Sequence, residues 1–220
     1  MNNNELKKEL LKTLENSFKS QRFILKGSSL VSENEKGFYQ VISISLGLST
    51  SIMKNHFGIS FGIATEEWIN FLNNYKRPKN ISTSDCEIRD CDNILFVKRE
   101  GWFPIYEEKN KMFREIENYI NETIFNFFEF LKSRDNLIAE WRKFNFKIGF
   151  AEGRHKLAIG IILLHINNVE EGQLLLQKLY NQKKENDYFT KVIENIFNVF
   201  KIKLKIEKKN LLQKIINRLK

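Results

Sequence analysis

The fold of this chain is decided by two neighbouring stretches, FYQVISISLGL (residues 38–48) and NHFGISFGIA (residues 55–64). In the second stretch, large apolar residues occupy the odd positions from Phe57 to Ile63, while glycine, serine and alanine occupy the even ones. A β-strand points successive side chains to opposite faces, so this period of two predicts two strands. Residues 49–54 are then expected to be a hairpin connection.

Each predicted strand has one bulky face and one smooth face, and the two faces need different neighbours. The bulky face requires a deep hydrophobic layer. The smooth face allows close approach of a helix, another backbone segment or a ligand. Close packing of a helix is the interpretation we favour, with a ligand platform as the alternative.

Further elements are predicted on both sides of this strand pair. Leu6, Leu10 and Leu14 recur every four residues, which is typical of an amphipathic helix packed on a core. Thr65 is expected to cap a helix whose first turn carries Glu66 and Glu67. The expected elements of the first half are a helix at 4–19, short strands at 22–25 and around Leu30, a turn at 32–37, a helix at 65–75 ending before Pro78, and a return to the sheet within 82–105.

The second half is predicted to be helical. Residues 112–132 carry the clearest apolar helical face, and helices are expected at 137–144, 154–166, 169–182, 187–203 and 209–219. Residues 155–180 are predicted to form a helical hairpin with small residues such as Gly160 and Gly172 and a tight turn at Asn167 and Asn168.

We therefore predict an α+β protein: a small, mainly antiparallel sheet flanked by helices, followed by an α-helical C-terminal half. The expected division is a sheet domain at 1–108 and a helical region at 109–220 packed on it, or one continuous domain.

Composition narrows the class of protein. The 220 residues are 42% hydrophobic and 29% charged, as in ordinary globular proteins. Residues 1–11 are polar and of mixed charge, unlike a secretory signal, and the apolar stretch 157–164 is far shorter than a bilayer requires. Two cysteines give no disulfide framework. We expect a cytoplasmic protein that makes no membrane contact.

Positive charge is concentrated at the C-terminal end. The formal net charge is +9, and residues 181–220 contribute +7 of it, from eleven Lys or Arg against four Asp or Glu. The residues that could contact phosphates or an acidic partner are Lys201, Lys203, Lys205, Lys208 and Lys209. Lys201, Lys203 and Lys205 alternate with apolar residues, which fits either a strand edge or the end of a helix. A solvated face is the simpler interpretation of this cluster.

Motifs for catalysis are missing from the sequence. Cys86 and Cys91 are five positions apart among acidic residues, without the second cysteine pair or histidines that a zinc site needs, so an acidic turn is the favoured interpretation. Neither a Gly-x-Ser-x-Gly elbow nor a Walker-type phosphate loop occurs. We therefore assign no catalytic, cofactor-binding or metal-binding residue, and a non-enzymatic role is favoured.

The chain resembles the bacterial family catalogued as domain of unknown function 4304. The resemblance covers roughly residues 5–182 and rests on SQRFILKGSSLV (20–31), FYQVISISLGLST (38–50), FGISFGIATEEWINFL (57–72) and KLAIGIILLHINNVEEGQLLLQKLY (156–180). YQVISISL (39–46) departs from the F-Q-K-S style of strand more usual in that family. The resemblance implies a helix, a strand pair and a C-terminal helical hairpin in a bacterial protein, but it transfers no activity and no catalytic residue.

Two functions from different classes follow as hypotheses. The first is a protein-interaction protein of a bacterial conflict or defence system, either an immunity-type antagonist or an accessory subunit, with a protein partner. The second is a nucleic-acid-associated protein that binds phosphates through the basic C-terminal tail. An enzyme that uses the smooth sheet face as the floor of a pocket ranks third.

Overall fold

The structure is a computed structural model that describes residues 2–47, 55–72, 80–89, 101–144, 152–182 and 188–204. The chain forms two compact units, Met1–Asn145 and Phe146–Lys220. The first unit contains α1 (Asn3–Ser17), β1 (Ile24–Lys26), β2 (Ser29–Glu35), β3 (Phe38–Leu46), β4 (His56–Thr65), α2 (Glu66–Leu72), the 3-10 turn η1 (Thr83–Asp85), β5 (Ile88–Arg89), β6 (Trp102–Pro104), α3 (Lys109–Tyr119), the π-helical turn η3 (Ile120–Ile124), α4 (Phe125–Phe130) and α5 (Arg134–Phe144). The second unit contains α6 (Glu152–His165), α7 (Val169–Gln182) and α8 (Tyr188–Val199).

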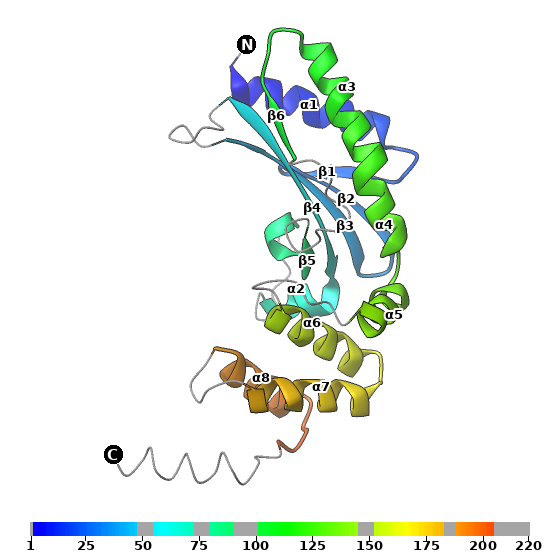
Figure 1. The fold of residues 1–220 in the computed structure, drawn as a ribbon, viewed down its shortest axis with the longest axis vertical. Helices are drawn as coiled ribbons and strands as arrows, with labels where there is room; N and C mark the ends of the chain where they lie inside the picture. The colour runs from blue at the N-terminus through cyan, green and yellow to red at the C-terminus, as the bar shows by residue number, and fades with distance from the viewer. Residues whose placement is uncertain are drawn as a thin grey trace, which may run out of the picture. The chain divides into compact units, whose positions relative to one another are not determined.

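The first unit is built on an antiparallel sheet of six strands (Figure 1). Strands β1 to β4 form a meander, and β5 and β6 both pair with the outer edge of β4. The predicted hairpin is confirmed, with Phe38 opposite Thr65 and Leu46 opposite Phe57 in unbroken register. Its connection at 49–54 lies outside the described residues. The α+β class predicted from the sequence is confirmed.

The bulky face of the sheet carries the main core of this unit. Phe61 on β4 contacts the rings of Phe127 and Phe128 on α4, with centroids 5.1 and 6.3 Å apart. At the end of α1, the ring of Phe18 packs edge-on against Phe125 at 5.0 Å. Helix α1 and the α3–α4 helix therefore cover this face together (Figure 1). Because its phenylalanines complete this core, the long helix that the sequence assigned to the second region belongs to the first unit.

The smooth face is covered by shorter segments. Ala64 packs in a buried cluster with Ile69 of α2 and with Ile81 and Cys86, which flank η1. A Cβ atom added at Gly62 would lie 2.4 Å from the carbonyl oxygen of Ile88, so β5 can pair closely only with a glycine at that position. The close approach expected on this face is thus made by a helix and by backbone.

The boundaries of the early strands differ from those expected. Strand β2 continues to Glu35, so the turn comprises only Lys36 and Gly37, and Gly37 has a φ of +70°. The register shifts between Glu33 and Glu35, which leaves Asn34 as the extra residue of a β-bulge. The polar composition of residues 32–37 reflects this bulge and an exposed strand end.

The long helix predicted at 112–132 is present as α3, η3 and α4. Its buried residues Ile116, Ile120, Ile124 and Phe128 recur every four residues. In a regular α-helix of 3.6 residues per turn this row would drift by about 40° at each step. The wider π turn of η3 offsets that drift and keeps the row on the sheet.

The second unit begins with the predicted helical hairpin. A Cβ atom at Gly160 of α6 would lie 2.5 Å from Leu176 of α7, and one at Gly172 would lie 3.0 Å from the Gly160 oxygen. The small residues therefore let the two helices approach closely. Leu174 lies on α7 as expected, but its side chain is 69% exposed. No helix within the described residues is long and apolar enough to span a membrane.

Helix α8 ends four residues before the predicted boundary at residue 203. Lys201 adopts a left-handed conformation with φ of +54°, and the Ile202 N–H donates to the Phe197 oxygen at 2.8 Å. This is the hydrogen-bond pattern of a Schellman cap, which stops the helix. Lys201 therefore lies at the end of a helix, one of the two expected settings, and Lys203 follows it outside any helix or strand. The helix expected at 209–219 lies outside the described residues.

Candidate functional site

One end of the second unit gathers three chain segments. Helices α6 and α7 meet at the turn that Asn167 forms with φ of +65°. The ring of His165, the last residue of α6, lies edge-on to Phe200 after α8, with centroids 4.9 Å apart. The C-termini of α6 and α8 and the N-terminus of α7 thus lie together. We call this region the distal end, defined by Ile166, Val169, Val199, Lys201 and Lys203.

Exposed apolar side chains are concentrated at the distal end. Ile166 is 39% exposed, Val169 41% and Val199 50%. Seven large apolar side chains are exposed among the described residues, and these three share one end of a small helical unit. Singly exposed apolar residues are ordinary on protein surfaces, but a group rimmed by polar residues is typical of an interaction site.

The distal end also holds the described part of the predicted basic cluster. Lys201 and Lys203 are both exposed. The αL cap turns the chain at Lys201, so the two lysines follow the exposed Val199 directly. The other predicted contacts, Lys205, Lys208 and Lys209, lie outside the described residues. The site therefore combines apolar side chains with two lysines after α8 and with Glu170 and Glu171 in the first turn of α7.

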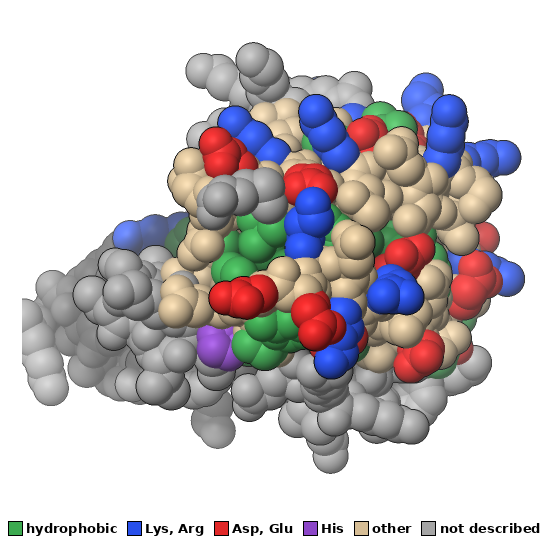
Figure 2. All heavy atoms as spheres, turned by 90° about the horizontal axis from the view of Figure 1, so that it is seen from above, with side chains coloured by type: hydrophobic (Ala, Val, Ile, Leu, Met, Phe, Trp, Pro, Cys, Tyr) green, Lys and Arg blue, Asp and Glu red, His purple; other side chains and the backbone are tan. Residues whose placement is uncertain are grey.

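Charges on the first unit are mixed. The end of the unit seen in Figure 2, over α1 and α3, carries Lys and Arg side chains interspersed with Asp and Glu. This agrees with the sequence, in which residues outside 181–220 contribute only about +2 of the net charge. An acidic ligand or partner is thus attracted more strongly by the C-terminal part of the chain.

A hydroxyl network occupies the smooth sheet face. The Thr83 N–H donates to the Ser43 hydroxyl at 3.1 Å, and the Thr83 hydroxyl lies 2.9 Å from that of Ser60. Ser29 extends the row through a 2.7 Å contact with Ser43. The turn η1 packs on these serines. The backbone of η1 therefore covers this part of the smooth face, which the sequence allowed as the floor of an enzyme pocket.

Arg134 forms a charged cluster that the sequence did not reveal. Its guanidinium donates to both oxygens of Glu67 at 3.0 Å and to Glu35 at 2.7 Å. It also donates to the oxygens of Lys36 and Gly37, at 2.9 and 2.8 Å. Because all five of its N–H groups are used, Arg134 fastens the β2–β3 turn, α2 and α5 together and has no donor left for a ligand. The partners lie 67 to 99 positions away in the chain, which is why no local pattern predicted them.

Burial of Arg134 alone would lower its pKa. The hydrogen bonds and negative charges of Glu67 and Glu35 outweigh that effect and raise the pKa instead. The guanidinium therefore stays charged.

Glu87 is a buried acid beside this cluster. Its side chain is 1% exposed, and its Oε2 accepts the N–H of Thr65 at 3.0 Å. Among the described residues, nothing donates to its Oε1. Burial raises the pKa of Glu87 to about 8, although the hydrogen bonds from its own backbone and from Thr65 act in the opposite direction. The carboxyl group is thus largely protonated at neutral pH.

The cysteines can be placed in part. Cys86 is buried in the cluster beneath η1, and its thiol approaches the Ser82 oxygen at 3.7 Å. Cys91 lies outside the described residues, together with the acidic turn proposed around it. Within the described ranges, no group of three or more His, Cys, Asp or Glu side chains could hold a metal ion.

Comparison of the chain with family models, with curated proteins and with solved structures gives no match.

Proposed function

We propose that this chain is a non-enzymatic protein-interaction protein of a bacterial conflict or defence system, either an immunity-type antagonist or an accessory subunit. The observation that carries the interaction role is the distal end, where exposed Ile166, Val169 and Val199 adjoin exposed lysines. The bacterial setting rests on the resemblance to domain of unknown function 4304, and a cytoplasmic location is part of the same proposal.

The partner is a protein with an apolar patch bordered by acidic residues. Protein interfaces commonly bury a few apolar anchors inside a polar rim, and the anchors supply most of the affinity. The lysines of the distal end would contribute electrostatic complementarity, which mainly accelerates association and selects the partner. Binding should therefore weaken with salt but persist in part, because the apolar contacts are not screened.

Affinity purification with matched variants tests this proposal. The tagged protein is purified from the organism that encodes it, with and without nuclease, and bound proteins are identified by mass spectrometry. We expect a stoichiometric partner that survives nuclease treatment. It should be lost from the Val169→Asp, Val199→Asp double variant and from each single variant, and kept by Leu174→Asp, which places the same charge as a single variant at an exposed apolar position outside the distal end.

Two results would contradict the proposal. One is the recovery of nucleic acid without a stoichiometric protein. The other is equal retention of the partner by the double variant and by wild type, which would exclude the distal end as the interface.

Nucleic-acid association is the second candidate, and it is favoured by the exposure of Lys201 and Lys203. Sequence-independent binding needs little more than a cluster of cations that replaces the counterions of the phosphate backbone. If the chain binds nucleic acid in this way, the apolar residues of the distal end do not contribute to binding. This difference distinguishes the second candidate from the first.

A further inference from the structure

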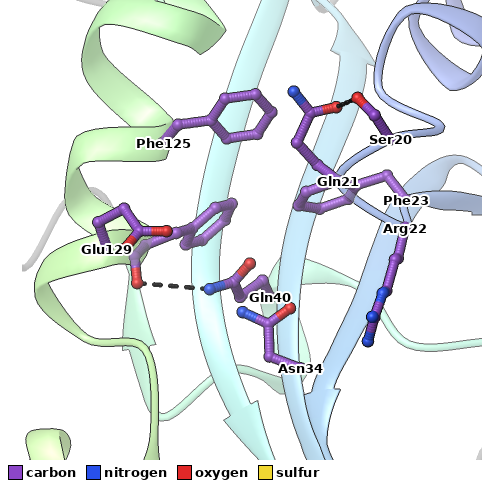
Figure 3. A pocket seen from close by; sticks show the side chains of 9 residues that line it. Ser20, Gln21, Arg22, Phe23, Asn34, Gln40, Phe125 and Glu129 are labelled. Carbon is purple, nitrogen blue, oxygen red and sulfur yellow. Dashed lines mark hydrogen bonds between the residues drawn. The ribbon is translucent and has the colours of Figure 1, made fainter.

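A cavity of about 370 Å³ opens in the first unit between α4 and the segment that joins α1 to β1. Its walls come from three parts of the chain: residues 20–23, strands β2 and β3, and α4 (Figure 3). The volume lies at the lower end of the range typical of small-molecule sites, so any occupant must be small. The cavity belongs to the first unit and is independent of the distal end.

Gln40 forms the floor of this cavity and breaks the apolar pattern of its strand. It occupies the bulky face of β3 between Phe38 and Ile42, where it is only 5% exposed. Its Nε2 donates to the Phe128 oxygen over a long 3.4 Å, while its Oε1 has no protein partner among the described residues. Figure 3 shows this oxygen directed into the cavity. A buried amide can make four hydrogen bonds, so Gln40 is underused by the protein.

Asn34 presents a second amide to the same space. It is the bulge residue of β2, and bulges commonly redirect a side chain next to a binding site. The buried Ser32 hydroxyl donates to Asn34 Oδ1 at 3.2 Å and to the Gln21 backbone oxygen at 3.0 Å. It thereby connects the β2 wall of the cavity to the wall formed by residues 20–23. With its oxygen engaged, Asn34 retains its Nδ2 as a donor. Gln40 and Asn34 therefore offer one acceptor and one donor.

The third irregularity is at Arg22. It has a φ of +62° and lies in the turn that follows α1, which the Phe23 N–H closes by donating to the Phe18 oxygen at 3.3 Å. A left-handed conformation costs a residue with a side chain roughly 1–2 kcal/mol, so glycine would be the favoured choice for stability alone. An αL arginine, a β-bulge and a buried, half-satisfied glutamine thus converge on one cavity. Such departures from local rules are expected at functional sites.

The lining also indicates the chemistry of the occupant. Arg22 and Glu129 stand on opposite walls, so their charges compensate and the cavity favours an uncharged molecule. Phe125 and Phe128 line the α4 wall, and both rings stack on Phe23, with centroids 5.7 and 6.0 Å apart. A small uncharged ring with a donor and an acceptor on one edge fits this lining, because amide side chains pair with the edges of nucleobases.

We propose that this cavity binds a nucleobase or its nucleoside, with Gln40 and Asn34 reading the edge of the base. The test is titration of the full-length, ¹⁵N-labelled protein with adenosine, guanosine, cytidine and uridine, monitored by NMR. We expect at least one nucleoside to shift the side-chain amide signals of Gln40 and Asn34. D-Ribose alone is the matched ligand control and should shift neither signal.

Two variants keep the test decisive. Gln40→Leu retains volume on an apolar face, so it should preserve the fold while weakening nucleoside binding at least tenfold. Asn34→Ala should weaken binding by a similar factor, whereas Asn4→Ala, an exposed asparagine at the other end of α1, should leave it unchanged. Absence of binding at millimolar concentration for all four nucleosides would overturn the proposal. Binding that is insensitive to Gln40→Leu and Asn34→Ala, or that D-ribose reproduces, would also overturn it.

Discussion

At Glu87, burial and charge conflict more strongly than at the other acids that the structure describes. The side chain is buried, and only Oε2 of its two oxygens has a donor within the described residues. The raised pKa resolves the conflict, since the protonated form carries no charge to desolvate. The consequence is a dependence of stability on pH that can be assigned a sign.

The folded protein holds the Glu87 proton more tightly than the unfolded chain does. Between the usual pKa of 4.5 and the folded value of about 8, the folded state binds more protons, so stability contributed by Glu87 falls as pH rises through this window. The slope is at most about 1.4 kcal/mol per pH unit, and the loss is complete above pH 8.

We predict that Glu87→Gln removes this dependence. The stability of the variant relative to wild type should increase steadily from pH 5 to pH 8 and then level off, because glutamine cannot ionise. Urea unfolding at a series of pH values measures the difference, and Glu122→Gln, at an exposed position of the π turn, controls for the loss of one carboxylate. A difference between Glu87→Gln and wild type that does not change with pH would show that Glu87 is ionised in the folded state.

Residues with positive φ other than glycine lie at the two proposed sites. Arg22, Asn167 and Lys201 are the described residues other than glycine with this conformation; Asn167 and Lys201 follow the ends of α6 and α8, and Arg22 lies in the turn after α1. Two of them lie in the distal end or at its turn, and the third lines the cavity. The sequence indicated the turn at Asn167, because asparagine tolerates the αL region. It gave no such signal for arginine and lysine, which have no local preference for that conformation.

At the scale of elements, periodic sequence predicted structure well and irregular sequence did not. The strand pair and helix α7 were predicted because their side chains repeat with periods of two and 3.6. The bulge at Asn34, the seat of η1 on Ser43 and Ser60, and the π turn each depend on residues distant in the chain. For the same reason the cavity was missed, since its walls come from segments about 20 and 90 positions apart.

Contact between α6 and α7 gives a prediction at this scale. Gly160→Ala should gain up to about 1 kcal/mol of helix propensity. It should lose more, roughly 1–3 kcal/mol, because the new methyl group would lie 2.5 Å from Leu176 Cδ2 in a packed interface. We therefore expect a net decrease in the free energy of unfolding of the second unit, measured by urea denaturation.

A double-mutant cycle separates packing from propensity. Leu176→Ala removes the atoms that the new methyl group would meet, so Gly160→Ala should be neutral or stabilising in that background. Equal effects of Gly160→Ala with and without Leu176 would mean that the helices do not approach closely at this point.

At the scale of the whole molecule, charge is divided unequally between the two units. The first unit mixes both signs, whereas residues 181–220 carry +7 of the net +9. Such an asymmetry produces a long-range field that attracts acidic proteins and nucleic acids alike. Net charge therefore cannot choose between the two proposed functions, but the response to salt and to lysine substitution can.

The last prediction uses that response. Five lysines, Lys201, Lys203, Lys205, Lys208 and Lys209, are replaced by glutamine, and a matched variant carries glutamine at five exposed lysines of the first unit: Lys8, Lys12, Lys19, Lys36 and Lys132. If the tail binds nucleic acid, wild type should bind single-stranded DNA with a salt slope near −3.5, from about −0.7 for each of five phosphate contacts. The tail variant should lose this binding and the matched variant should keep it, as measured by fluorescence anisotropy between 50 and 200 mM salt. Equal binding by the two variants would mean that any affinity for DNA depends on net charge alone. The tail lysines would then be expected to contact acidic residues of a protein partner.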